Sequence, residues 1–249
     1  MGGMTTALTP ERYLELVDRD TDRLIAMGER GLKAEVPSCP GWDVAEVVWH
    51  VATVYEHKVR VMADNAWPDP WPPKWEFADD EEIAFLRSAR SRLFEEFARH
   101  DIDEQTTTFG EDSTIGFWVR RMACEIAIHR YDGELAHDDT TPIDADIALD
   151  GIDEFLRVML SRDWRGRTEH PVDADVAVES GGIRWRGRIT SGEVAFAPGS
   201  REPAAFTISG EPEAVFLWLW GRVGDDRVRL DGDGALVSEL RARMVEAAQ

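Results

Sequence analysis

The sequence predicts a bundle of helices followed by a small α+β domain. Apolar residues recur at helical spacing in four long segments before residue 138, and this spacing changes to a two-residue alternation after residue 165. Gly-Gly and Ser-Gly pairs separate the alternating segments, as expected for turns between strands. We therefore expect a four-helix bundle over residues 1–164 and an α+β domain with an antiparallel sheet over residues 165–249.

The first two helices carry clear N-terminal signals. Thr9 is a good N-cap, Pro10 suits the first helical position, and Gly31 is placed to end the first helix. Asp43 is the expected N-cap of the second helix, with Glu46 three residues later as in a capping box.

The third to fifth helices follow from charge and periodicity. The third, over 79–100, opens with four acidic residues, which are favourable at a helix N-terminus. The fourth begins near Ser113 and extends through the segment STIGFWVRRMACEIAIHRYDGELAH, and the fifth covers 145–160. Between the second and third helices, residues 66–77 (AWPDPWPPKWEF) contain too much proline for a helix. We expect an ordered aromatic loop there, over one end of the bundle.

The remaining chain alternates as strands do and then returns to helical spacing. The expected strands are ADVAVES, IRWRGRIT, EVAFA and AAFTISG, with turns at Gly181-Gly182 and Ser191-Gly192. An apolar helix, EPEAVFLWLWGR, a strand and turn, RVRLDGDG, and a closing helix, GALVSELRARMVEA, complete the domain.

Net charge and cysteine content restrict the partners and the compartment. There are 49 Asp plus Glu residues against 28 Lys plus Arg, so the net charge is −21. Such a surface repels phosphate backbones and anionic lipids, so we expect neither nucleic acid nor membrane as a partner. Two cysteines imply no disulfide framework. There is neither a secretory signal pattern nor a run of about 18 apolar residues, and we expect a cytoplasmic protein.

A carboxylate and an imidazole stand four residues apart in the apolar stretch MACEIAIHRYDGE, residues 122–134. On a helix, Glu125 and His129 would be offset by only about 40° and separated by about 6 Å, so they can aim at one point. Together they suit a borderline divalent metal such as zinc. His50, on the facing second helix, could supply a third ligand. Three ligands leave one position open, as in catalytic zinc sites.

Other interpretations of these residues stay open. Glu125 and His129 could form only an ion pair, and a lone helical histidine such as His50 is commonly a core residue. Asp132 could orient the imidazole of His129 or pair with an arginine. His57 lies about 10 Å from His50 along the helix, too far to share its metal, and is expected at the mouth or surface. Three further histidines lie at helix ends or in loops, where a solvated role is expected: His100, His137 and His170.

The sequence gives weaker support to catalytic or binding sites other than a metal site. Cys39 precedes a turn and Cys124 is expected to pack, so neither is a convincing nucleophile. Phosphate-binding loops and the GxSxG and HExxH motifs are absent from the sequence. Arg222 follows a strongly apolar helix, where its guanidinium could hold a ligand carboxylate by two hydrogen bonds. Compensation of the helix dipole is the more ordinary explanation of an arginine at this position.

Taken in order, these segments resemble the mycothiol-dependent maleylpyruvate isomerase family, part of the DinB-like superfamily of metal-binding bundles. The first matching block is the turn Pro40-Gly41-Trp42 before the helix of His50, and the second is the Glu-x-x-x-His of Glu125 and His129, followed by Arg-Tyr-Asp. The third is Leu-Trp-Gly-Arg, ending at Arg222, before a strand that ends in Gly-Asp. The resemblance covers nearly the whole chain, although the loop 66–77 has no counterpart in it.

The resemblance implies a DinB-like four-helix bundle and metal ligation by His50, Glu125 and His129. It also implies mycothiol as cosubstrate, with a metal-bound thiolate as nucleophile and Arg222 as the anchor of a substrate carboxylate. The expected activity is that of an isomerase or S-transferase acting on a small electrophile, with zinc or another divalent metal. Two other classes of function remain: a non-catalytic metal- or ligand-binding module, and a structural protein in which Glu125 and His129 only pair with each other.

Overall fold

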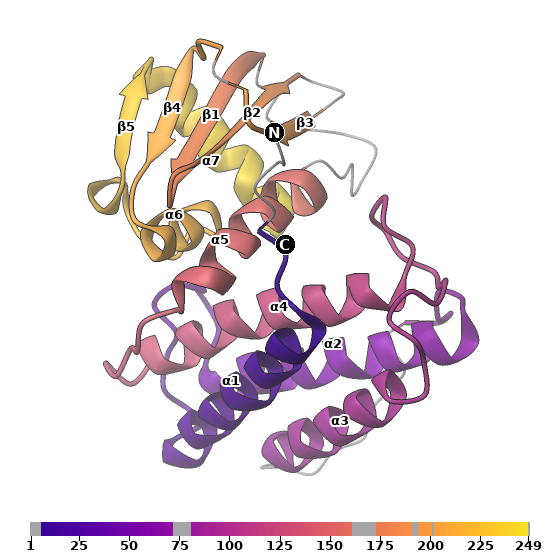
Figure 1. Ribbon diagram of the computed structural model, residues 1–249. Coiled ribbons are helices and arrows are strands. Elements are labelled where there is room, and N and C mark those ends of the chain that lie inside the picture. The colour runs from indigo at the N-terminus through magenta and orange to yellow at the C-terminus, as the bar shows by residue number, and fades with distance from the viewer. Residues whose placement is uncertain (1–5, 72–80, 161–172, 191–193, 201, 249) are drawn as a thin grey trace. The chain divides into compact units, whose positions relative to one another are not determined.

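The chain folds into two compact units in the computed structural model, which describes residues 6–71, 81–160, 173–190, 194–200 and 202–248 (Figure 1). The first unit comprises Leu8–Thr141, and the second contains the chain from Pro142 onward. The expected boundary at residues 164 and 165 therefore falls inside the second unit. The fifth helix belongs there because its Gly151 lies directly against the ring of Phe216, in the apolar helix that follows the strands.

Four helices form the first unit: α1 (Pro10–Arg30), α2 (Val44–Asp64), α3 (Glu82–Phe97) and α4 (Ile115–Leu135). The Thr9 hydroxyl accepts a hydrogen bond from the backbone N–H of Arg12, and Gly31 caps the end of α1. Asp43 and Glu46 form a complete capping box at the start of α2. Because these signals act within a few residues, the sequence predicted both helix starts correctly.

Buried polar and small residues set how the four helices meet. The hydroxyl groups of Thr21 on α1 and Tyr55 on α2 lie 2.8 Å apart in the core. At Gly133 on α4, an added Cβ would lie 2.7 Å from a methyl group of Leu24 on α1. The side chain of Leu24 therefore packs directly on Gly133, and a larger residue there would force that side chain to move.

The described part of the aromatic loop, residues 66–71, is non-helical, as predicted. Its two tryptophans pack against rings of the bundle: Trp67 lies 6.2 Å from Trp118 and 5.8 Å from His57, and Trp71 lies 4.6 Å from His57, between ring centroids. The rest of the predicted loop lies outside the described residues.

The second unit begins with α5 (Ala145–Glu154), which continues into a π-helical turn, Phe155–Met159. The strands that follow are β1 (Ala174–Ser180), β2 (Ile183–Ile189), β3 (Val194–Pro198) and β4 (Phe206–Ser209). Then come α6 (Pro212–Leu219), a 3-10 turn at Asp225–Arg227, β5 (Arg229–Gly232) and α7 (Gly234–Ala248).

The sheet has the order β3-β2-β1-β4-β5 and is mixed, which corrects the expectation of an antiparallel sheet. The pairs β1–β2, β2–β3 and β4–β5 are antiparallel, whereas β1 and β4 run parallel, with Val176 opposite Phe206. The reason is that the chain crosses from the edge strand β3 back to the free side of β1, instead of forming a hairpin. The turn at Gly181-Gly182 has positive φ at both residues and joins β1 to β2 as predicted. Ser191-Gly192 lies outside the described residues.

No helix within the described ranges combines the length and the apolar character needed to cross a bilayer. This finding agrees with the absence of a long apolar run in the sequence.

Candidate metal centre

The central part of α4 is buried on all sides: every residue from Arg121 to Glu134 is buried. Several of these residues are charged, and a buried charge is costly unless it meets a partner. Arg130, for example, is fully buried and donates hydrogen bonds to Glu134 and to the carbonyl group of Thr141. The same question of a partner applies to Glu125 and His129, one helical turn apart.

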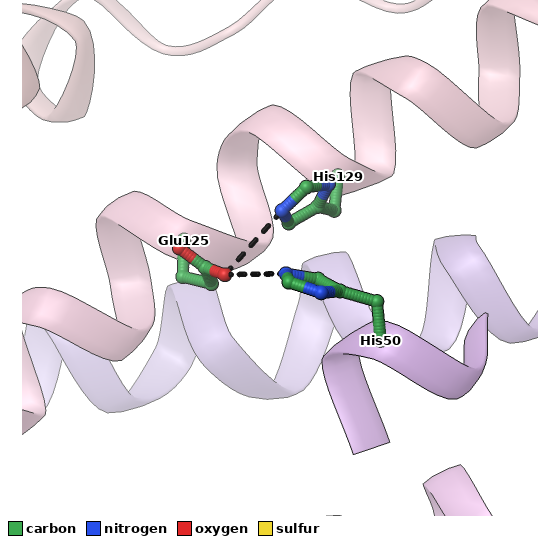
Figure 2. Close-up of side chains that lie close together, drawn as sticks. All are labelled: His50, Glu125 and His129. Carbon is green, nitrogen blue, oxygen red and sulfur yellow. Dashed lines mark hydrogen bonds and ion pairs between the residues drawn. The ribbon is translucent and has the colours of Figure 1, made fainter. Parts of the chain in front are cut away.

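Glu125, His129 and His50 converge on one point between α2 and α4 (Figure 2). The Oε1 atom of Glu125 lies 3.1 Å from Nε2 of His50 and 3.3 Å from Nε2 of His129. One ligand atom from each residue can be chosen so that all three lie within 4.8 Å of one another. The structure therefore brings together the three residues that the spacing and the facing helix predicted.

The two histidines differ in their access to solvent. The side chains of Glu125 and His129 are 9% and 8% exposed, whereas that of His50 is 35% exposed. The rings of His50 and His129 lie edge to face, with centroids 4.7 Å apart. The group is therefore closed on the α4 side and reachable from the side of His50.

Contacts with Asp132 and Ser38 orient the imidazole of His129. Nδ1 of His129 lies 3.1 Å from Oδ2 of Asp132, and the hydroxyl of Ser38 donates to Oδ1 of the same carboxylate at 2.6 Å. When Nδ1 carries its proton toward Asp132, the lone pair of Nε2 faces the convergence point. Asp132 therefore acts as the orienting partner of His129, one of the two roles that the sequence left open.

The Pro-Gly-Trp turn before α2 supports the other histidine. The N–H of Trp42 donates to the carbonyl oxygen of Cys39 at 2.9 Å, and Gly41 has a φ of +88°, as in a type II turn. This turn places the Trp42 ring 5.3 Å from the ring of His50, between centroids. Ser38 lies directly before this turn and contacts Asp132, whereas Trp42 ends the turn and contacts His50.

Charge interactions shape the protonation of the group. Burial lowers the pKa of His50, which favours a neutral ring with a free lone pair. Burial alone would raise the pKa of Glu125, but the Arg121 guanidinium and the two histidines hold it well below its usual range. The pKa of His129 is raised because its hydrogen bonds to Asp132 and Glu125 outweigh the effect of burial.

The residues present fit a divalent metal ion. Two imidazole nitrogens and one carboxylate oxygen are a donor set typical of zinc, and three protein ligands leave a fourth position for another molecule. The hydrogen bond between Asp132 and His129 is the outer contact that histidine ligands of metals usually make. Arg121 was not among the predicted site residues, although its position four residues before Glu125 signals a helical ion pair.

Two models of known protein families match most of the chain. The family model described as the mycothiol maleylpyruvate isomerase N-terminal domain matches residues 9–133, and that described as the MDMPI C-terminal domain matches residues 146–239. The chain belongs to the mycothiol maleylpyruvate isomerase family. No curated protein sequence matches it.

Solved structures agree with this family assignment at the level of fold. A crystal structure of the mycothiol-dependent maleylpyruvate isomerase matches with a TM-score of 0.54 and 18% identity, over 90% of this chain and 93% of that chain. A crystal structure of a histidine-to-alanine mutant of the mycothiol-dependent maleylpyruvate isomerase matches with a TM-score of 0.52 and 16% identity, with the same coverage. The two family models thus match segments of both compact units of the chain.

Arg222, the residue of the Leu-Trp-Gly-Arg segment that resembles the family pattern, lies in the second unit just after α6. Its guanidinium donates to the carbonyl oxygen of Trp220 at 2.8 Å, and its backbone N–H donates to the carbonyl oxygen of Leu217. These contacts satisfy carbonyl groups at the end of α6, which agrees with the ordinary explanation of an arginine there. Its role toward a substrate stays a proposal.

The remaining histidines of this family member have partners of their own. Nδ1 of His57 lies 3.0 Å from Nζ of Lys58, and burial followed by the charge of Lys58 lowers the pKa of His57 to about 3. His100 bonds to Glu96 and Glu104, and Nε2 of His137 donates to the carbonyl oxygen of Met27. His170 lies outside the described residues.

Proposed function

We propose that the protein is a divalent-metal- and mycothiol-dependent enzyme, an isomerase or an S-transferase that acts on a small electrophile. The observation that carries the proposal is the convergence of His50, Glu125 and His129, with one ligand atom from each, on a point reachable from the His50 side. Family membership supports the choice of mycothiol as the thiol.

Each of these residues would have a defined part in holding the metal. His50 and His129 would each offer an Nε2 lone pair, and Glu125 would offer Oε1. Asp132 would keep the proton of His129 on Nδ1, and Ser38 would keep Asp132 in place. When bound, a divalent metal stabilises the thiolate form of a thiol near neutral pH.

The chemistry of the thiolate then explains both candidate activities. Its sulfur would add to an activated cis double bond, whose electron pair moves onto the activating group and leaves a single bond that can rotate. Return of that electron pair would expel the thiolate and give the trans isomer, whereas protonation of the adduct from solvent before its release would complete an S-transfer. Arg222, by two hydrogen bonds to a carboxylate, would anchor an acidic substrate.

Metal analysis of purified protein tests the first part of this proposal. We expect one divalent ion per chain in the wild type and a loss of bound metal in His50→Ala, because two ligands hold a metal much more weakly than three. His57→Ala is the matched control, since it removes a histidine two turns along the same helix, and it should retain the metal. Absence of a stoichiometric ion in the wild type, or retention of full metal by His50→Ala, would overturn the metal site.

Thiol consumption with a panel of electrophiles tests the second part. We expect mycothiol to support turnover of at least one small electrophile by the metal-loaded wild type and not by His50→Ala. Stoichiometric metal without turnover with any thiol would instead identify a non-catalytic binding module.

A further inference from the structure

The two oxygen atoms of Glu125 face different partners. Oε1 lies within 3.3 Å of Nε2 of both His50 and His129. Oε2 forms an ion pair with the guanidinium of Arg121, one helical turn earlier on α4. The Arg121 side chain is only 5% exposed, so this pair is buried. One oxygen of the carboxylate thus faces the two histidines, and the other faces Arg121.

We propose that Arg121 is a positioning residue that makes Glu125 a one-oxygen ligand and thereby keeps the remaining coordination positions open. The proposal rests on the metal site proposed above. A carboxylate can bind a metal through one oxygen or through both. An ion bound among the three donor atoms would be held by Oε1 of Glu125 and by Nε2 of each imidazole. A second bond to Oε2 would require the carboxylate to turn away from Arg121.

Breaking that ion pair would be unfavourable for two reasons. A guanidinium remains protonated at all ordinary pH values, so Arg121 cannot lose its charge when its partner turns away. Turning Oε2 away would therefore break a buried ion pair, and the loss of one side of a buried ion pair is strongly destabilising. The metal itself, by contrast, replaces contacts on the other oxygen only, because the imidazoles must offer lone pairs to it. The Arg121 contact is compatible with a bound ion, whereas hydrogen bonds from Nε2 of the imidazoles to Oε1 would give way to the metal.

The charge of Arg121 also matters for the molecule that enters the open position. Arg121 offsets the negative charge that Glu125 brings to the metal, so the metal site has a more positive net charge than it would have without Arg121. An incoming thiol is then more readily ionised, because its thiolate form gains more from the site. Removal of Arg121 should therefore change both the number of bonds to the metal and the ionisation of the bound thiol.

Cobalt(II) substitution provides a spectroscopic test, because four-coordinate Co²⁺ absorbs visible light more strongly than five-coordinate Co²⁺. We expect a four-coordinate spectrum for the wild type. Arg121→Met should bind one Co²⁺ with a lower molar absorbance than the wild type, as both oxygens of Glu125 reach the ion. Arg121→Lys keeps the charge and should restore most of the wild-type spectrum. Arg120→Met, which removes the same charge at the preceding position, is the matched control and should match the wild type.

The outcomes separate this proposal from the one on which it rests. If the wild type binds no Co²⁺, the metal site fails. If the wild type and Arg121→Met both bind one Co²⁺ with the same spectrum, the metal site stands and the positioning role of Arg121 is wrong. If Arg121→Met does not fold, a crystal structure of the metal-loaded wild type decides. One bonded Glu125 oxygen, with Oε2 still on Arg121, supports the proposal, and two bonded oxygens overturn it.

Discussion

Asp132 shows how a single residue away from the ligands can govern the site. It bonds to Nδ1 of His129 through one oxygen and accepts from Ser38 through the other. It is fully buried, so both of these contacts are shielded from solvent. The tautomer of His129, and with it the direction of the Nε2 lone pair, therefore depends on this carboxylate.

We expect Asp132→Ala to weaken Zn²⁺ binding by about 10- to 100-fold, the usual effect of losing such an outer partner. Competition with a chromophoric chelator measures the affinity. Ser38→Ala should have a smaller effect in the same direction, because Asp132 keeps its contact with His129. Asp101→Ala, at an exposed position of the same unit, is the control. Equal affinity in Asp132→Ala and the control would show that His129 is oriented by other contacts.

At the scale of elements, the start of α2 positions His50 in the bundle. Asp43 accepts from the N–H of Glu46 at 3.1 Å, and the Glu46 carboxylate accepts from the N–H of Asp43 at 2.6 Å. Asp43 also lies 3.3 Å from Nζ of Lys33, whose side chain is mostly exposed. Asp43 therefore takes part in a helix cap and in an exposed ion pair, and the cap is expected to contribute more to stability.

We expect Asp43→Ala to lower the free energy of unfolding by about 1 kcal/mol, because the first turn of α2 loses its cap. Asp43→Asn should retain most of the stability, since asparagine also caps helices well. Lys33→Ala should have almost no effect, because an exposed ion pair contributes little. Urea unfolding of the four proteins measures these differences. A loss in Lys33→Ala as large as that in Asp43→Ala would show that the ion pair, and not the cap, stabilises this helix start.

For the whole molecule, the candidate metal site lies entirely within the unit Leu8–Thr141. His50 and the pair on α4 come from segments far apart in the sequence, so the unfolded chain does not hold the three ligands together. A metal that binds only the folded unit stabilises it by mass action. The second unit contributes none of the three ligands.

We expect saturating Zn²⁺ to raise the Tm of the unit Leu8–Thr141, with about 2.7 kcal/mol of stabilisation when the free ion is at 100 times its Kd. Addition of a chelator should reverse the shift. Differential scanning calorimetry with and without metal measures it, and His50→Ala serves as the control. A shift of equal size in His50→Ala would show that the stabilising ion binds somewhere else on this strongly acidic protein.

The sequence by itself determined the helices, most of the strands and the pairing of Glu125 with His129, and it offered His50 as a candidate third ligand. Helix starts at Thr9 and Asp43 were predictable because capping involves contacts between residues only three apart. Glu125 and His129 were predictable as a pair because helical spacing alone places them on one face. His50 was a hypothesis until the contact between α2 and α4 brought its Nε2 to Glu125.

Only the tertiary structure decided the features that join distant segments. Ser38 reaches Asp132 across 94 positions of the chain, and no local pattern marks such a contact. The parallel pairing of β1 with β4 depends on the route of the chain between β3 and β4. The place of α5 in the second unit depends on the elements against which this helix packs. Tertiary structure also decides that one oxygen of Glu125 contacts the two histidines and the other contacts Arg121. Residue spacing shows which side chains can face each other, whereas packing decides which atom of each side chain makes the contact.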